Sequence, residues 1–137
     1  MDVPRIVAVG MTDKAGALAE LPVRVLSARD GQRALRHLRG RSTDLLIGRW
    51  ELPGMEPGEL FERVREAKPY LPTVAVVEAG NADQEVAARS LGVSAVLPED
   101  MGEGNFRGIV CDMLGLPKLL QIEKRHALVP LHRGEKQ

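Results

Sequence analysis

The sequence is poor in the residues that build disulfides and metal sites. Cys111 is its single cysteine, which excludes an intramolecular disulfide and any metal site made of several cysteines. The three histidines, His37, His126 and His132, show no metal-ligand spacing. The amino-terminal residues contain no long apolar run of the kind found in a signal peptide or a membrane span. We therefore expect a cytoplasmic protein that holds no metal and contacts no membrane.

The sequence also lacks net charge. Lysine plus arginine and aspartate plus glutamate number 19 each, so no overall charge attracts nucleic acid or anionic lipid. The loop 10–16 contains glycine and lysine, but it matches neither the P-loop nor the dinucleotide-binding fingerprint. We accordingly expect no nucleotide, no other cofactor and no nucleic-acid partner.

The residues that are present are typical of one globular domain. The chain has 137 residues, of which 44% are hydrophobic and 28% charged, enough for a single core. Gly115 is suited to end a last helix and Pro117 to begin another segment. The sequence thus predicts a domain at 1–116 followed by an amphipathic, basic tail at 117–137.

Short apolar runs alternate with longer amphipathic stretches along the domain. The runs are typical of strands buried on both faces, and the stretches of surface helices with one apolar stripe. This alternation predicts an α/β fold with a doubly wound, five-stranded parallel sheet. Only thirteen residues join the first two strands, so the first helix, at 13–20, is short. The other expected helices are 32–38, 59–67 and 83–91, and the expected strands are 5–9, 23–26, 44–47, 73–77 and 95–97.

Several residues mark the ends of these helices. Asp30 and Asn81 are suited to begin a helix, because their side chains can accept hydrogen bonds from its first N–H groups. Gly40 and Gly92 lie where a helix would end on a left-handed residue. The helix after Asn81 is expected to bury Val86 in its apolar stripe.

Three segments resemble the receiver domain of bacterial two-component response regulators. DLLIGRWELPGM (44–55) with EPG after it is similar to that family's third strand and the Pro-Gly-Met-Asp-Gly type of loop that follows. AARSLGVSAVL (87–97) is similar to its fourth helix and fifth strand, and LSARDGQRALRHLRG (26–40) to its second strand and helix. The resemblance covers about residues 4–115. It implies a flavodoxin-like sheet of strand order 2-1-3-4-5 and a role in signal transduction.

The resemblance also identifies five positions that carry phosphoryl transfer, and this chain has replaced all of them. In the family, two acids and an aspartate hold Mg²⁺, and a hydroxyl and a lysine contact the phosphoryl group. Arg49, at the position of the accepting aspartate, is a permanent cation without a nucleophilic lone pair. We therefore expect a degenerate pseudo-receiver that is not an enzyme. The matching residues are Gly10 and Met11 for the acids, Arg49 for the aspartate, Val77 for the hydroxyl and Glu99 for the lysine.

Arg49 and Glu99 invert the charges that the family places across this pocket. The sequence leaves two interpretations open, an ion pair between the two side chains or two independently solvated loop charges. An exposed pair is worth only about 0 to 1 kcal/mol, so its interest would be conformational, as a lock on one loop arrangement.

Candidate partner surfaces follow from the same resemblance. The family commonly makes partner or self contacts through its fourth helix, fifth strand and fifth helix, which indicates Arg89, Val96, Glu99 and Arg107. Val96 also replaces the aromatic switch residue of that strand. Trp50 is either an interface anchor or the filler of a hydrophobic slot. The tail is either a docking segment or a frayed linker, and its candidate contact residues are Leu116, Leu119 and Leu120.

The expected function is binding of another signalling or scaffold protein, or of a second copy, without phosphorylation. Two alternatives remain at this point. One is a small anion- or metabolite-binding module that uses the Arg49 pocket. The other is a nucleic-acid adaptor that uses Arg29, Arg33 and Arg36 on one face of the second helix, a face that is otherwise simply solvated.

Overall fold

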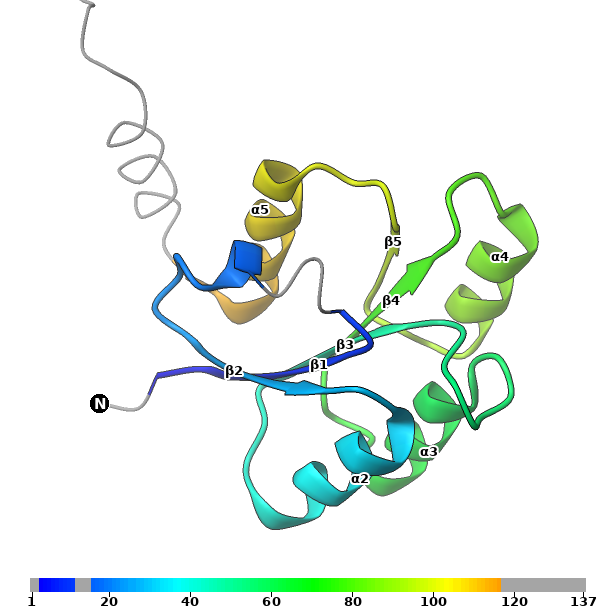
Figure 1. The fold of residues 1–137 in the computed structure, drawn as a ribbon, viewed down its shortest axis with the longest axis horizontal. Coiled ribbons are helices and arrows are strands. Elements are labelled where there is room, and N and C mark those ends of the chain that lie inside the picture. The colour runs from blue at the N-terminus through cyan, green and yellow to red at the C-terminus, as the bar shows by residue number, and fades with distance from the viewer. Residues whose placement is uncertain (1–2, 12–15, 117–137) are drawn as a thin grey trace, which may run out of the picture.

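A five-stranded β-sheet with helices on both faces makes up the part of the chain that the computed structural model describes, residues 3–11 and 16–116 (Figure 1). The strands are β1 (Arg5–Val9), β2 (Arg24–Ala28), β3 (Leu45–Arg49), β4 (Thr73–Val77) and β5 (Ala95–Pro98). The helices are α2 (Gly31–Gly40), α3 (Glu59–Ala67), α4 (Ala82–Ser90) and α5 (Glu103–Leu114). The predicted α/β class is confirmed.

The strands lie in the order β2-β1-β3-β4-β5, and every neighbouring pair is parallel. This is the predicted flavodoxin-like order. Because the winding reverses at β1, the loops after β1 and β3 diverge at the carboxyl edge of the sheet, where doubly wound folds place their sites.

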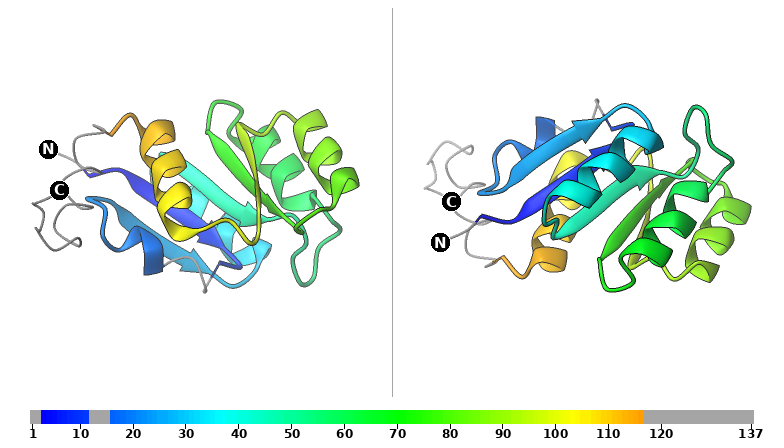
Figure 2. Two further views of the ribbon diagram at one scale, coloured as in Figure 1. Left: turned by 90° about the horizontal axis from the view of Figure 1, so that it is seen from above. Right: turned by 90° about the horizontal axis from the view of Figure 1, so that it is seen from below.

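Each face of the sheet has its own hydrophobic core. Ile6 points to the face that α5 covers and packs in one cluster with Phe106. Val9 and Leu46 point to the other face and pack in a second cluster with Phe61 of α3. Seen from above, α5 lies in front of the strands, and seen from below, α2 and α3 do (Figure 2).

Most predicted helix ends are confirmed. The Asp30 side chain accepts a hydrogen bond from the N–H of Arg33 at 2.9 Å, and Asn81 accepts from the N–H of Gln84 at 3.0 Å. Gly92 follows α4 with a φ of 84°, in the left-handed region. The prediction for Gly40 is wrong, because Gly40 is the last residue of α2 and the chain then leaves in an extended conformation.

Two predictions of burial are also wrong. Val86 is 63% exposed, because α4 turns the small residue Ala88 to the core instead. The second strand is not buried on both faces, since Leu26 is 38% exposed. That strand is the edge of the sheet, and α2 leaves part of it uncovered.

Two predicted segments, the short first helix and the carboxyl-terminal tail, include residues that the structure does not describe. Residues 16–18 are helical, whereas residues 12–15 of the short first helix lie outside the described residues. The predicted tail at 117–137 lies outside them too. Within the described ranges, no helix is long and apolar enough to cross a membrane.

Candidate functional site

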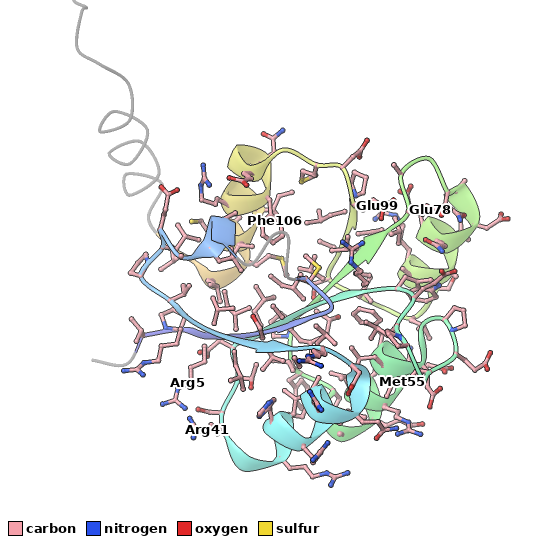
Figure 3. All side chains as sticks on the ribbon, viewed as in Figure 1. Arg5, Arg41, Met55, Glu78, Glu99 and Phe106 are labelled. Carbon is pink, nitrogen blue, oxygen red and sulfur yellow. The ribbon has the colours of Figure 1, made fainter. Side chains whose placement is uncertain are left out.

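The carboxyl ends of four strands bring the predicted pocket residues together. Gly10 and Met11 follow β1, Arg49 ends β3, Val77 ends β4, and Glu99 follows β5. The strands pair in register up to these ends. The five positions therefore meet at one edge of the sheet, where Glu99 is labelled in Figure 3.

Arg49 joins the loops after β1 and β5. Its Nε donates a hydrogen bond to the carbonyl oxygen of Gly10 at 2.7 Å. Its Nη1 donates to Oε1 of Glu99 at 3.1 Å, which confirms the ion pair. The Arg49 and Glu99 side chains are 30% and 41% exposed, so solvent weakens the attraction and the pair contributes only about 0 to 1 kcal/mol.

Gly10 has a backbone that a larger residue would strain. Its φ of 68° lies in the left-handed region, and a Cβ here would come within 2.9 Å of Cδ2 of Leu52. Its N–H donates to the carbonyl of Ala28 at 2.9 Å, which holds the turn against β2. The position that the sequence resemblance matches to an acid of receivers is thus shaped here for a residue without a side chain.

Met11 and Val77 belong to the hydrophobic cores. Met11 is almost fully buried in the cluster beneath α5, and Val77 is buried in the cluster beneath α3. Neither side chain offers oxygen to a hard cation or to a phosphoryl group. Among the described residues there is also no group of three or more His, Cys, Asp or Glu side chains placed to hold a metal ion.

Trp50 fills a slot in the core, so its interpretation as an exposed interface anchor is wrong. The indole is only 7% exposed and stacks on Phe61, with ring centroids 5.9 Å apart. Gly58 accommodates it, because a Cβ on Gly58 would come within 2.4 Å of Cη2 of Trp50. The backbone N–H of Gly58 also donates to the Trp50 carbonyl at 2.9 Å. The loop 51–58 is therefore folded around the indole.

A hydrogen-bond network that we did not predict joins the loops after β3 and β4. Gln84 of α4 donates from Nε2 to Oε2 of Glu51 at 3.0 Å and accepts at Oε1 from the N–H of Glu78 at 2.8 Å. Asn81 donates to the Glu78 carboxylate at 3.0 Å. The signal in the sequence was the spacing of Asn81 and Gln84, which resembles a capping box. Cap and network together hold the β4–α4 loop beside Arg49.

The surroundings of Arg49 do not favour an added anion. A groove of about 370 Å³ lies beside the pocket between β4, β5 and the start of α4. Glu78 and Glu85 line it, together with the half-buried Val96. Arg49 already donates to Glu99 and to the Gly10 carbonyl.

The predicted partner residues lie on different elements, α4, β5, α5 and the segment after α5, and do not gather at one place. Arg89 lies on the exposed side of α4, where it pairs with Glu85 at 3.0 Å. Arg107 is less accessible than predicted, because its guanidinium lies 3.9 Å from Glu20 and 3.8 Å from Glu103 and its Nη1 is buried. Leu116 is half-buried against the core beneath α5. Leu119 and Leu120 lie outside the described residues.

Two of the three arginines predicted on the second helix belong to α2, and Arg29 precedes its N-cap. All three are exposed, and Arg33 lies 3.9 Å from the carboxylate of Asp30. Their surroundings add no aromatic platform for bases.

Known structures share this fold. No protein-family model matches the chain, and no curated protein matches it. The signal receiver domain of an HD domain-containing protein from Pseudomonas fluorescens Pf-5 is similar at a TM-score of 0.75 and 22% identity, over 83% of this chain and 96% of that one. A putative response regulator from Chloroflexus aurantiacus J-10-fl is similar at 0.76 and 21% identity, over 83% and 99%.

A third similar structure is a CheY-like response regulator receiver domain protein from Methanospirillum hungatei JF-1. It has a TM-score of 0.75 and 17% identity, and the match covers 89% of this chain and 99% of that one. The chain therefore has the fold of response regulator receiver domains.

Proposed function

We propose that the protein is a pseudo-receiver that works without phosphorylation and acts by binding another protein in signalling or localisation. It is a binding module and not an enzyme, and its place is the bacterial cytoplasm. The partner is a signalling or scaffold protein, or a second copy of the chain.

The observation that carries this proposal is the contact between Arg49 and Glu99 at 3.1 Å. In the receivers that the sequence resembles, these positions hold an aspartate that accepts the phosphoryl group and a lysine that contacts it. Here a guanidinium fills the acceptor position, and Met11 and Val77 are buried in the cores. Among the described residues, the five matching positions therefore offer neither the nucleophile nor the Mg²⁺ ligands that phosphoryl transfer needs.

The exposed side of α4 is the surface that we assign to the partner. Val86 is 63% exposed there, and Arg89 lies on the same helix with its pairing to Glu85 open to solvent. The half-buried Val96 of β5 lies in the adjoining groove. An apolar residue ringed by charges is the composition of a modest protein interface.

Affinity purification from the source organism tests this proposal, with wild-type protein, Val86→Asp and Tyr70→Asp as baits. Tyr70 is the matched control, because it is 96% exposed and belongs to the loop between α3 and β4 and not to α4. We expect a partner that binds the wild-type and Tyr70→Asp baits and does not bind Val86→Asp. The wild-type bait should recover this partner in equal yield with EDTA and with Mg²⁺ and acetyl phosphate. Retention only with the phosphodonor contradicts the proposal, and analytical ultracentrifugation of the same variants identifies the case of a second copy.

A further inference from the structure

A groove lies at the amino-terminal end of β1 and β2, at the opposite edge of the sheet from Arg49. Its volume is about 320 Å³, within the range of small-molecule sites. Arg5 and Val7 of β1 and Arg24 and Leu26 of β2 form its floor, and His37 of α2 lies at its wall. Arg41, Ser42 and Thr43, which follow α2, complete the rim.

The groove exists because α2 covers β1 more than the edge strand. Val7 is buried, whereas Leu26, its register partner on β2, is 38% exposed. After Gly40 the chain turns away in an extended conformation, which leaves this corner of the sheet open. Figure 3 shows Arg5 and Arg41 at this corner, between the start of β1 and the end of α2.

Positive charge gathers in the groove, and none of the described residues that line it is a carboxylate. Arg5 and Arg24 are register partners on strands about 4.8 Å apart, so both side chains project from the same face of the sheet. Like charges placed in this way repel each other. Within residues 3–11 and 16–116, no carboxylate forms an ion pair with Arg5, Arg24 or Arg41, and the nearby Asp44 accepts from the backbone N–H of Arg5 at 2.8 Å.

We propose that this groove binds a small organic phosphate. A phosphoryl dianion offers three oxygens to the guanidinium groups of Arg5, Arg24 and Arg41, and guanidinium forks match phosphate geometry. A single carboxylate would neutralise less of this charge. Val7 and Leu26 provide an apolar floor for the carbon skeleton, and Ser42 and Thr43 on the rim are the hydroxyl residues available to its polar groups.

Titration of the full-length protein, followed by ¹H–¹⁵N NMR and thermal shift, tests this site. The probes are inorganic phosphate, pyrophosphate and glucose 6-phosphate, with glucose and sodium chloride at matched ionic strength as controls. We expect saturable shifts at residues 5, 24–26 and 41–43 with the phosphates, strongest for glucose 6-phosphate, and none with glucose. Because bonds to charged groups are each worth about tenfold or more in affinity, Arg24→Gln and Arg41→Gln should each weaken binding about tenfold.

Arg36→Gln is the matched control, because Arg36 lies on α2 and does not line the groove. We expect this variant to keep wild-type affinity, and circular dichroism shows whether each variant is folded. An equal loss in Arg36→Gln would mean diffuse attraction to a basic surface and overturns the proposal. Shifts that sodium chloride reproduces, no saturable shifts with any phosphate, or binding of a glutamate-rich peptide in place of the phosphates overturn it as well.

Discussion

Arg49 and Glu99 form an ion pair across one pocket, with Nη1 of the arginine 3.1 Å from Oε1 of the glutamate. The residues come from β3 and from the segment after β5, on either side of β4. Arg49 also donates to the Gly10 carbonyl, so a single guanidinium connects the end of β3 with the loops after β1 and β5. The charges are inverted relative to the receivers that the sequence resembles, and the contact needs no metal.

Disrupting this pair should have a small effect on stability. We expect Glu99→Gln to lower the free energy of unfolding by about 0 to 1 kcal/mol. Arg49→Gln should cost about 1 kcal/mol more, because the bond to the Gly10 carbonyl is lost as well. Urea denaturation of both single variants and the double variant measures the coupling. The more exposed ion pair between Arg89 and Glu85 on α4 is the control for this coupling free energy. A coupling of zero between residues 49 and 99 would argue against a lock on the loop arrangement.

Gly10 should tolerate no side chain. We expect Gly10→Ala to destabilise the protein by about 1 to 3 kcal/mol, because the φ of 68° is strained for alanine and the Cβ approaches Leu52. Gly104→Ala is the matched control, since a Cβ there meets no atom within 4 Å. That variant should gain about 0.5 to 1 kcal/mol from the lower entropy of its unfolded chain. Equal stability of the two variants in thermal unfolding would contradict the described turn.

Trp50 should contribute to stability through packing. We expect Trp50→Ala to cost about 3 to 5 kcal/mol, because it leaves a cavity between Phe61 and Gly58. Tyr70→Ala, at a fully solvated aromatic residue, should change stability by less than about 0.5 kcal/mol. Circular dichroism during urea denaturation measures both changes. A small loss of stability in Trp50→Ala would contradict the burial of the indole and would favour its interpretation as an exposed interface anchor.

The cap of α4 should support the loop beside the pocket. Asn81 accepts a hydrogen bond from the Gln84 N–H, so Asn81→Ala should cost about 1 kcal/mol. Asn105→Ala, at an exposed position within α5, should be neutral or slightly stabilising. Amide hydrogen exchange should show faster exchange at Glu78 and Gln84 in Asn81→Ala alone. Unchanged exchange there would show that the network does not depend on the cap.

Local pattern was sufficient to predict a parallel sheet and most helix ends, because the inner strands are apolar runs and caps are short-range chemistry. The strand order came from the resemblance to receiver domains. Val86 and Leu26 were misplaced for one shared reason. Burial there depends on how a helix lies across the sheet, and α4 packs on the small Ala88 while α2 leaves the edge of β2 open. The position of a helix across the sheet is set by tertiary packing and cannot be read from the periodicity of one segment.

The candidate site shows the same division. The positions of Arg49 and Glu99 each follow from a segment that resembles the receiver family, 44–55 and 87–97. Because both lie at the carboxyl ends of parallel strands, their proximity was predictable. The burial of Trp50 depended on Gly58 and Phe61, which approach the indole only after the loop 51–58 closes. The basic groove was missed because Arg5, Arg24 and Arg41 come from three separate segments, and only the register of β1 with β2 brings the first two together.

The central claim is that this pocket no longer accepts a phosphoryl group. The most direct test is a ¹H–¹⁵N NMR titration of the full-length protein with beryllofluoride and Mg²⁺, followed at Gly10, Arg49 and Glu99. Our account predicts that these resonances keep their positions at saturating concentrations of both. Saturable, Mg²⁺-dependent shifts centred on Arg49 would contradict it.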